Sequence, residues 1–109
     1  MDEKLKERFA GLEIRASILK AIAHPTRLFI IDELSKGEIC VCELTEMIGV
    51  DTSTVSKHLS KLKSAGIVTD RKEGLKVFYN LATPCVLNFF DCVDKVIKTT
   101  AEERLKLIS

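Results

Sequence analysis

The chain has 109 residues, a formal net charge of +1, 46% hydrophobic residues and 30% charged residues. This length predicts a single domain over residues 1–109, and the composition excludes a disordered or fibrous chain. The sequence has no run of about 18 apolar residues, so no membrane span is expected. Its first residues lack the basic start and apolar core of a secretory signal. We therefore expect a cytoplasmic protein whose four cysteines are reduced.

Two amphipathic helices are predicted at the start of the chain. The first covers residues 4–21, where apolar residues recur every three or four positions. Pro25 suits the first turn of a second helix, because the N–H that proline lacks has no partner there. Gly37 suits the end of that helix, since glycine commonly stops helices.

A helix-turn-helix is predicted in the middle of the chain. A short helix covers residues 41–48, the turn contains Gly49, and a second helix runs from the capping residues Asp51 and Thr52 to about Ala65. In this motif the second helix enters the major groove of DNA. Its polar face carries hydroxyls and lysines that can reach base edges or phosphates. The candidate DNA contacts are Ser53, Thr54, Ser56, Lys57, Ser60 and Lys61.

A β-hairpin is predicted after this motif. Residues 68–72 and 76–81 are short runs rich in β-branched or aromatic residues, and Gly74 lies in the turn between them. Six basic residues against two acidic ones lie between residues 52 and 76, which is typical of a phosphate footprint or of a solvated surface. At the hairpin tip, the candidates for phosphate or minor-groove contact are Arg71, Lys72 and Lys76. The alternative is a solvated turn that covers the core.

Four segments between residues 15 and 81 carry a family resemblance. They are Ala23-His24-Pro25-Thr26-Arg27-Leu28, Glu38-Ile39-Cys40-Val41-Cys42-Glu43-Leu44, the stretch from Ser53 through Ser56-Lys57-His58-Leu59 to Val68, and Arg71-Lys72-Glu73-Gly74 followed by Tyr79 and Leu81. In this order the sequence resembles the ArsR/SmtB family of metal- and metalloid-responsive winged-helix repressors. The resemblance implies a mainly α winged helix-turn-helix with a small β-hairpin, between a first and a last helix that form a homodimer. It also implies a sequence-specific repressor of double-stranded DNA that an inducer releases, and no enzyme.

The predicted last helix, from Pro84 to about Leu107, has an apolar stripe, as does the first helix. A small monomer could not easily bury both stripes. The candidate interface residues are Leu5, Phe9, Leu12, Val86, Phe89, Phe90 and Val93. A two-fold dimer implies an operator with inverted half-sites.

Cys40 and Cys42 match the thiol pair of the family's arsenic-type and cadmium/lead-type sensors. Soft thiolates favour As(III), Sb(III), Cd(II) or Pb(II) as the inducer, and no cofactor is required for folding. Residues two apart point about 200° apart on a helix, but to the same side of an extended segment. We therefore expect an ion that bridges both sulfurs to unwind or hold open the start of the helix at residue 41 and to displace the recognition helix.

The chain differs from the family's sensors in its further ligands. Some arsenic sensors have a third cysteine where this chain has Thr45, and the N-terminal cysteines of cadmium/lead sensors are absent from residues 1–39. The candidates for a third ligand are Cys85 and Cys92, seven residues apart on the last helix; their alternative role is that of small interface residues. Zinc sensing through the last helix is not expected, because both histidines of the chain lie elsewhere.

Two other functions are compatible with a chain that carries several thiols, namely an oxidant-responsive repressor and a thiol enzyme. A repressor that responds to oxidants or reactive sulfur species could use the same thiols. Because a Cys-x-Cys disulfide is strained, oxidation is expected to join Cys40 or Cys42 to a thiol of the last helix instead. A thiol enzyme is disfavoured, since the chain has no Cys-x-x-Cys motif and no catalytic Ser-His-Asp pattern.

Overall fold

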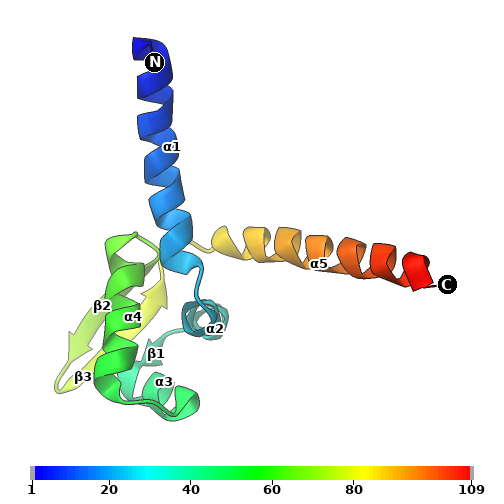
Figure 1. The fold of residues 1–109 in the computed structure, drawn as a ribbon. Helices are drawn as coiled ribbons and strands as arrows, with labels where there is room; N and C mark the ends of the chain where they lie inside the picture. The colour runs from blue at the N-terminus through cyan, green and yellow to red at the C-terminus, as the bar shows by residue number, and fades with distance from the viewer. Residues whose placement is uncertain (1, 109) are drawn as a thin grey trace.

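The structure, a computed structural model, describes residues 2–108. A helix-turn-helix and a small antiparallel sheet form the body, and a long helix projects from it at each end of the chain (Figure 1). The elements in chain order are α1 (Glu3–Ile22), α2 (Pro25–Leu34), β1 (Ile39–Cys40), α3 (Val41–Ile48), α4 (Thr52–Ser64), β2 (Val68–Glu73), β3 (Lys76–Leu81) and α5 (Val86–Ile108). This is the predicted winged helix-turn-helix.

Local signals explain where the helices begin and end. The Asp51 carboxylate accepts a hydrogen bond from the Thr54 backbone N–H at 3.3 Å and so caps α4. Pro25 stands at the first position of α2, as the sequence predicts. Gly49 ends α3 with a φ of 77°, a left-handed conformation that glycine adopts without a steric cost. The tight turn at Gly49 places α4 across α3.

The sheet has one strand more than the sequence predicts. Its order is β1-β3-β2, and all pairs are antiparallel. In the added pair, Ile39 lies opposite Tyr79 and Cys40 opposite Phe78. A two-residue strand has too little alternation to be detected in the sequence, so only its pairing with β3 reveals it. Through β1, the segment that carries the first cysteine becomes the edge of the wing sheet.

The hydrophobic core lies where the helix-turn-helix meets α2 and the sheet. Leu44 of α3 packs in one cluster with the apolar face of α4, and none of these side chains retains accessible surface. The fully buried members of the core are Ile30, Ile31, Leu44, Val55, Leu59, Leu62 and Val68. At about 25 cal/mol per Å² of apolar surface removed from water, this cluster provides the main force that holds α4 against α3.

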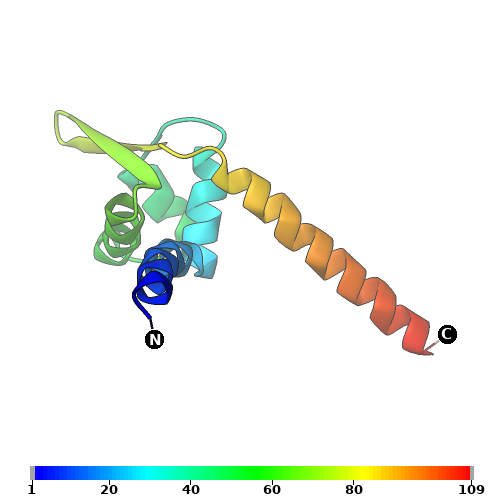
Figure 2. The same cartoon turned by 90° about the horizontal axis from the view of Figure 1, so that it is seen from above.

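Helices α1 and α5 project away from the body of the domain (Figures 1 and 2). They leave large apolar side chains exposed. Of the predicted interface residues, Leu5, Phe9, Leu12, Phe89 and Val93 are exposed in the single chain, and Phe90 is partly buried. Val86 is the exception. It is the first residue of α5 and only 7% exposed, because it packs into the core of its own chain. Its prediction as an interface residue was wrong, since the start of α5 lies against the body of the domain.

Candidate nucleic-acid interface and thiol pair

The polar face of α4 is open to solvent. Its inward face is held by the buried residues Val55, Leu59 and Leu62, so the predicted contact residues point away from the core. Ser53, Ser56, Lys57, Ser60 and Lys61 are exposed, and Thr54 is partly buried. Ser53 is already engaged locally, because its hydroxyl donates to Asp51 Oδ2 at 2.8 Å. Hydrogen bonds from Thr54 and Ser53 lower the pKa of Asp51, which keeps this helix cap ionised.

Arg27 of α2 links α1 to α4 through its guanidinium. No sequence pattern predicted this role. Arg27 Nη1 donates to the Ala21 carbonyl at 2.8 Å, and Arg27 Nε donates to His58 Nδ1 at 3.2 Å. The His24 ring lies 4.5 Å from the His58 ring, centroid to centroid. Burial lowers the pKa of His58, and the charges of His24, Arg27 and Lys61 lower it further. In its neutral form, His58 can therefore accept the hydrogen bond from Arg27 Nε at its Nδ1 atom.

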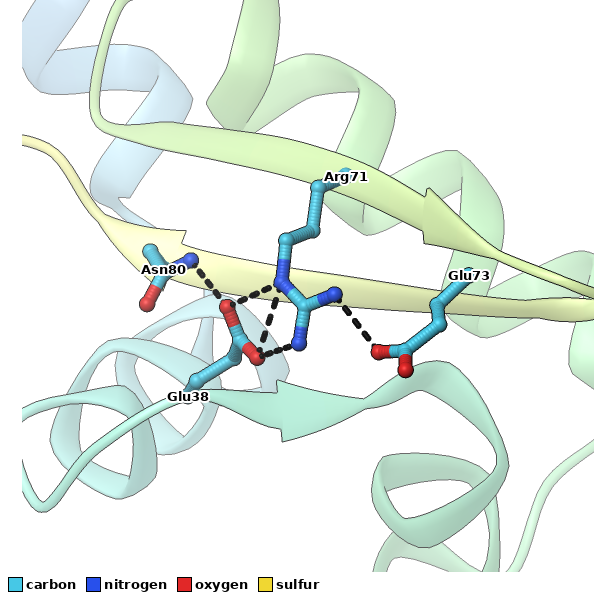
Figure 3. Close-up of polar contacts among 4 residues, drawn as sticks. All are labelled: Glu38, Arg71, Glu73 and Asn80. Carbon is cyan, nitrogen blue, oxygen red and sulfur yellow. Dashed lines mark hydrogen bonds and ion pairs between the residues drawn. The ribbon is translucent and has the colours of Figure 1, made fainter.

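The base of the wing is held by an ion-pair network that spans all three strands (Figure 3). Glu38, just before β1, reaches across β3 and meets Arg71 of β2, with Arg71 Nη2 2.5 Å from Glu38 Oε1. Asn80 Nδ2 donates to Glu38 Oε2 at 2.6 Å, and Arg71 Nη1 donates to Glu73 Oε2 at 2.7 Å. Hydrogen bonds from Arg71 and Asn80 lower the pKa of Glu38. The network therefore connects the wing to Glu38, which directly precedes β1 and its residue Cys40.

This network changes the interpretation of the basic hairpin. Arg71 is predicted from the sequence to contact phosphate, but its guanidinium binds two carboxylates and lies 4.7 Å from the centre of the Phe78 ring. Glu38 lies far away in sequence, so no local pattern indicates the pairing. Lys72 and Lys76 are exposed and form no ion pair with any residue in the described part of the chain. These two lysines are therefore the free cations of the wing.

Cys40 and Cys42 are joined in a disulfide at the start of α3, with Cα atoms 5.3 Å apart. Cys40 is the residue that caps the helix and has an extended backbone (φ −72°, ψ 145°), whereas Cys42 lies in the first turn. The side chain of Cys40 therefore folds over that turn, and its sulfur lies 3.3 Å from the backbone nitrogen of Cys42. Cys40 is buried and Cys42 is exposed.

The two sulfurs meet at the start of α3 because Cys40 is extended, as the sequence argument requires, and only Cys42 is helical. The effect of a bridging ion stays a prediction. The expected disulfide to the last helix is not found, since Cys85 and Cys92 are free and exposed. Cys85 precedes α5 and does not share a face of that helix. Within residues 2–108 no three His, Cys, Asp or Glu side chains are close enough to hold a metal ion.

Comparison with known proteins identifies the family. The model of the arsR family of bacterial regulatory proteins matches residues 24–70. Nodulation protein NolR of Rhizobium meliloti is 33% identical over 90 residues, which are 83% of this chain and 74% of NolR. The chain belongs to the ArsR family. The matched region contains α2, the helix-turn-helix and the start of the wing.

Other relatives of this ArsR-family chain agree in function and assembly. The arsenical resistance operon repressor of Staphylococcus xylosus is 42% identical over 66 residues, 61% of this chain and 64% of that protein. The homodimeric winged helix-turn-helix domain Mb0332 of Mycobacterium bovis has a TM-score of 0.74 at 32% identity, covering 94% of this chain and 93% of that one. The chain is thus a DNA-binding transcriptional repressor of a family with metalloid-responsive members and homodimeric neighbours, and these relatives are regulators, not enzymes.

None of the helices in residues 2–108 combines the length and the apolar character needed to cross a bilayer.

Proposed function

We propose that this ArsR-family chain represses transcription from an operator with inverted half-sites, and that a soft ion bound by Cys40 and Cys42 releases it. The observation that carries the proposal is the convergence of both sulfurs at the first turn of α3. Two thiolates at this spacing can chelate one thiophilic ion, with As(III) or Sb(III) favoured and Cd(II) or Pb(II) as further candidates. A helix N-terminus stabilises the thiolate form of a cysteine and so favours binding.

Once the Cys40–Cys42 pair is in the reduced dithiol form, the chemistry with arsenite needs no further reactant. Each thiol gives its proton to a hydroxide ligand of arsenous acid, a water leaves, and an As–S bond forms in its place. Two such steps give a cyclic dithiolate with one remaining ligand on arsenic. A third thiolate is not available within one chain, so that position is left to hydroxide, to a small thiol, or to Cys85 or Cys92 of a partner subunit.

The proposed coupling runs through two contacts of Cys40. Its side chain caps α3, and its backbone pairs with Phe78 of β3. An ion on the buried Cys40 sulfur needs space that the packed junction does not provide. The cap, the start of α3 and the β1–β3 pair must then shift together. Because α3 packs on α4, and β3 carries the wing, this shift would misplace both DNA-contacting elements.

The DNA contacts of the proposal are those that remain accessible. They are Ser53, Thr54, Ser56, Lys57, Ser60 and Lys61 on α4, with Lys72 and Lys76 on the wing. Arg71 is included only for a state in which Glu38 has released it. The proposed dimer contacts are Leu5, Phe9, Leu12, Phe89, Phe90 and Val93. The last three line an apolar hollow of about 450 Å³ between the end of α1, the start of α2 and α5.

A repressor that senses oxidants is the second candidate, and the Cys40–Cys42 disulfide favours it. A peroxide would supply the oxidising equivalents. One thiolate attacks a peroxide oxygen to give a sulfenic acid, and the second thiol displaces water from it to form the disulfide. In this reaction two thiols lose two electrons, and the peroxide is reduced to two waters.

One titration separates the two candidates. The reduced protein is bound to an operator duplex, and arsenite, Cd(II) and hydrogen peroxide are added in parallel while fluorescence anisotropy reports the bound DNA. We expect arsenite to release the wild type, but not Cys40→Ser or Cys42→Ser, while Cys85→Ser responds as the wild type does. Release by peroxide alone would support the oxidant sensor. Full release of Cys42→Ser by arsenite would contradict the thiol-pair mechanism.

A further inference from the structure

Leu75 at the tip of the wing is the most exposed large hydrophobic side chain in residues 2–108, at 105% of its reference area. It lies in a two-residue turn with Gly74, between Glu73 and Lys76, which pair across the hairpin. Gly74 has a φ of 62°, as expected at the first central position of a tight hairpin turn. Polar residues usually occupy such turns, so a leucine without any contact to its own chain needs an explanation.

The charges around Leu75 point to a partner. Lys72 and Lys76 flank it and form no ion pair within the described residues. The acidic neighbour Glu73 pairs with Arg71 at 2.7 Å, and Arg71 is shared with Glu38. The tip therefore presents an apolar side chain between two lysines that form no ion pair, and the wing keeps an excess of positive charge over these two carboxylates. The minor groove of DNA matches this arrangement, because it is a narrow groove between two rows of backbone phosphates and admits apolar side chains.

The placement of the wing supports the same partner. The Lys63 ammonium on α4 lies 3.0 Å from the Asp70 carboxylate on β2, so the hairpin is attached to the recognition helix. The Glu38–Arg71 ion pair holds its base from the other side. In Figure 1 the tip of the hairpin reaches the level of the N-terminal end of α4. When α4 lies in a major groove, the tip is thus positioned beside the same duplex.

We propose that Leu75 enters the minor groove beside each half-site and makes the repressor select A·T pairs there, while Lys72 and Lys76 contact the flanking phosphates. Guanine places an amino group on the floor of the minor groove, whereas A·T pairs do not. Covering that amino group with a leucine removes its water without giving it a hydrogen-bond acceptor, which is unfavourable. The inference rests on the DNA binding of the proposed function, and it does not depend on the inducer.

The test uses a duplex selected from a random pool by the reduced wild-type protein. Hydroxyl-radical footprinting locates the protected minor-groove pairs, and one A·T pair there is replaced by G·C or by I·C, which lacks the amino group. We expect G·C to weaken wild-type binding about tenfold and I·C to restore it. Leu75→Ser should weaken binding to the A·T duplex and lose this discrimination, whereas Leu75→Met should retain it.

The salt dependence separates apolar from ionic contacts. Leu75→Ser should leave the slope of log Kd against log salt unchanged, while Lys72→Gln or Lys76→Gln should each reduce it by about one. If Leu75→Ser discriminated G·C from A·T as the wild type does, the inference would be overturned while the proposed function stood. If the wild type selected no duplex at all, both would be overturned.

Discussion

Arg71 and Glu38 lie 33 positions apart in the sequence, yet Arg71 Nη2 is 2.5 Å from Glu38 Oε1 (Figure 3). This ion pair crosses β3, where Arg71 also stacks on Phe78. Phe78 in turn pairs with Cys40 through the β1–β3 ladder. The ion pair and the thiol pair are therefore both in contact with Phe78 of β3, and we expect a structural change at one to alter the other.

Replacing Glu38 by Gln removes one of the two carboxylates that bind Arg71 and leaves only the exposed pair with Glu73, so Arg71 should become available to the operator. A released guanidinium can reach phosphate, so we expect tighter DNA binding and a salt slope steeper by about one, since one more counterion is displaced. Anisotropy titrations at several salt concentrations measure the slope. Glu103→Gln removes a distant carboxylate and controls for net charge. The double variant Glu38→Gln/Arg71→Gln should return to the wild-type slope; an unchanged slope in Glu38→Gln would show that Arg71 stays off the DNA.

Stability should fall on the acid side because of His58. Its native pKa is lowered from 6.5, so the unfolded chain binds the proton more tightly than the folded chain. The contribution of neutral His58 is thus present above pH 6.5 and is lost as the pH falls from 6.5 through the lower native pKa. Protonation also sets two donors, Arg27 Nε and His58 Nδ1, against each other.

Urea unfolding of the wild type and of His58→Gln between pH 5 and 8 measures this effect. Glutamine offers Arg27 an acceptor and does not titrate, so the variant should lose less stability toward pH 5 than the wild type. The neighbouring groups His24, Arg27 and Lys61 are common to both proteins. Two parallel stability curves would rule out His58 as the titrating group.

Leu44 should be essential for the stability of the helix-turn-helix. Its side chain is fully buried between α3 and α4, so Leu44→Ala leaves a cavity and is expected to cost about 2–5 kcal/mol of unfolding free energy. Urea denaturation gives the value. Leu75→Ala makes the same chemical change at a fully exposed position and should alter stability by no more than about 0.5 kcal/mol. Equal losses in both variants would contradict the assigned core.

A charge at the proposed dimer contact should separate the subunits. Phe89 is 48% exposed in the single chain and lines the apolar hollow beside α1. Phe89→Glu would place a carboxylate without a partner in that interface, so we expect a monomer by sedimentation equilibrium and a large loss of operator affinity. Lys98→Glu also adds a negative charge to exposed α5 and should remain dimeric. A dimeric Phe89→Glu would move the interface elsewhere.

The elements that the sequence predicts correctly are those set by neighbouring residues. Helix caps, the glycine turn at Gly49 and the alternation in the hairpin all act within a few positions, so their signals can be read directly. The motif residues also indicated the family, which the comparison confirmed. The contacts to DNA and to the inducer remain predictions from those motifs.

The amino-acid sequence by itself determined the helices, the hairpin and the pair of thiols at the start of α3. Only the tertiary structure decided that β1 joins the wing, that Glu38 occupies Arg71, and that Val86 is a core residue. Each of these depends on surfaces brought together by packing across tens of residues, for which no local periodicity exists. The cysteine pair depends on both the sequence and the tertiary structure. The spacing of Cys40 and Cys42 is given by the sequence, but the extended backbone of Cys40, which lets the sulfurs meet, follows from the pairing of β1 with β3.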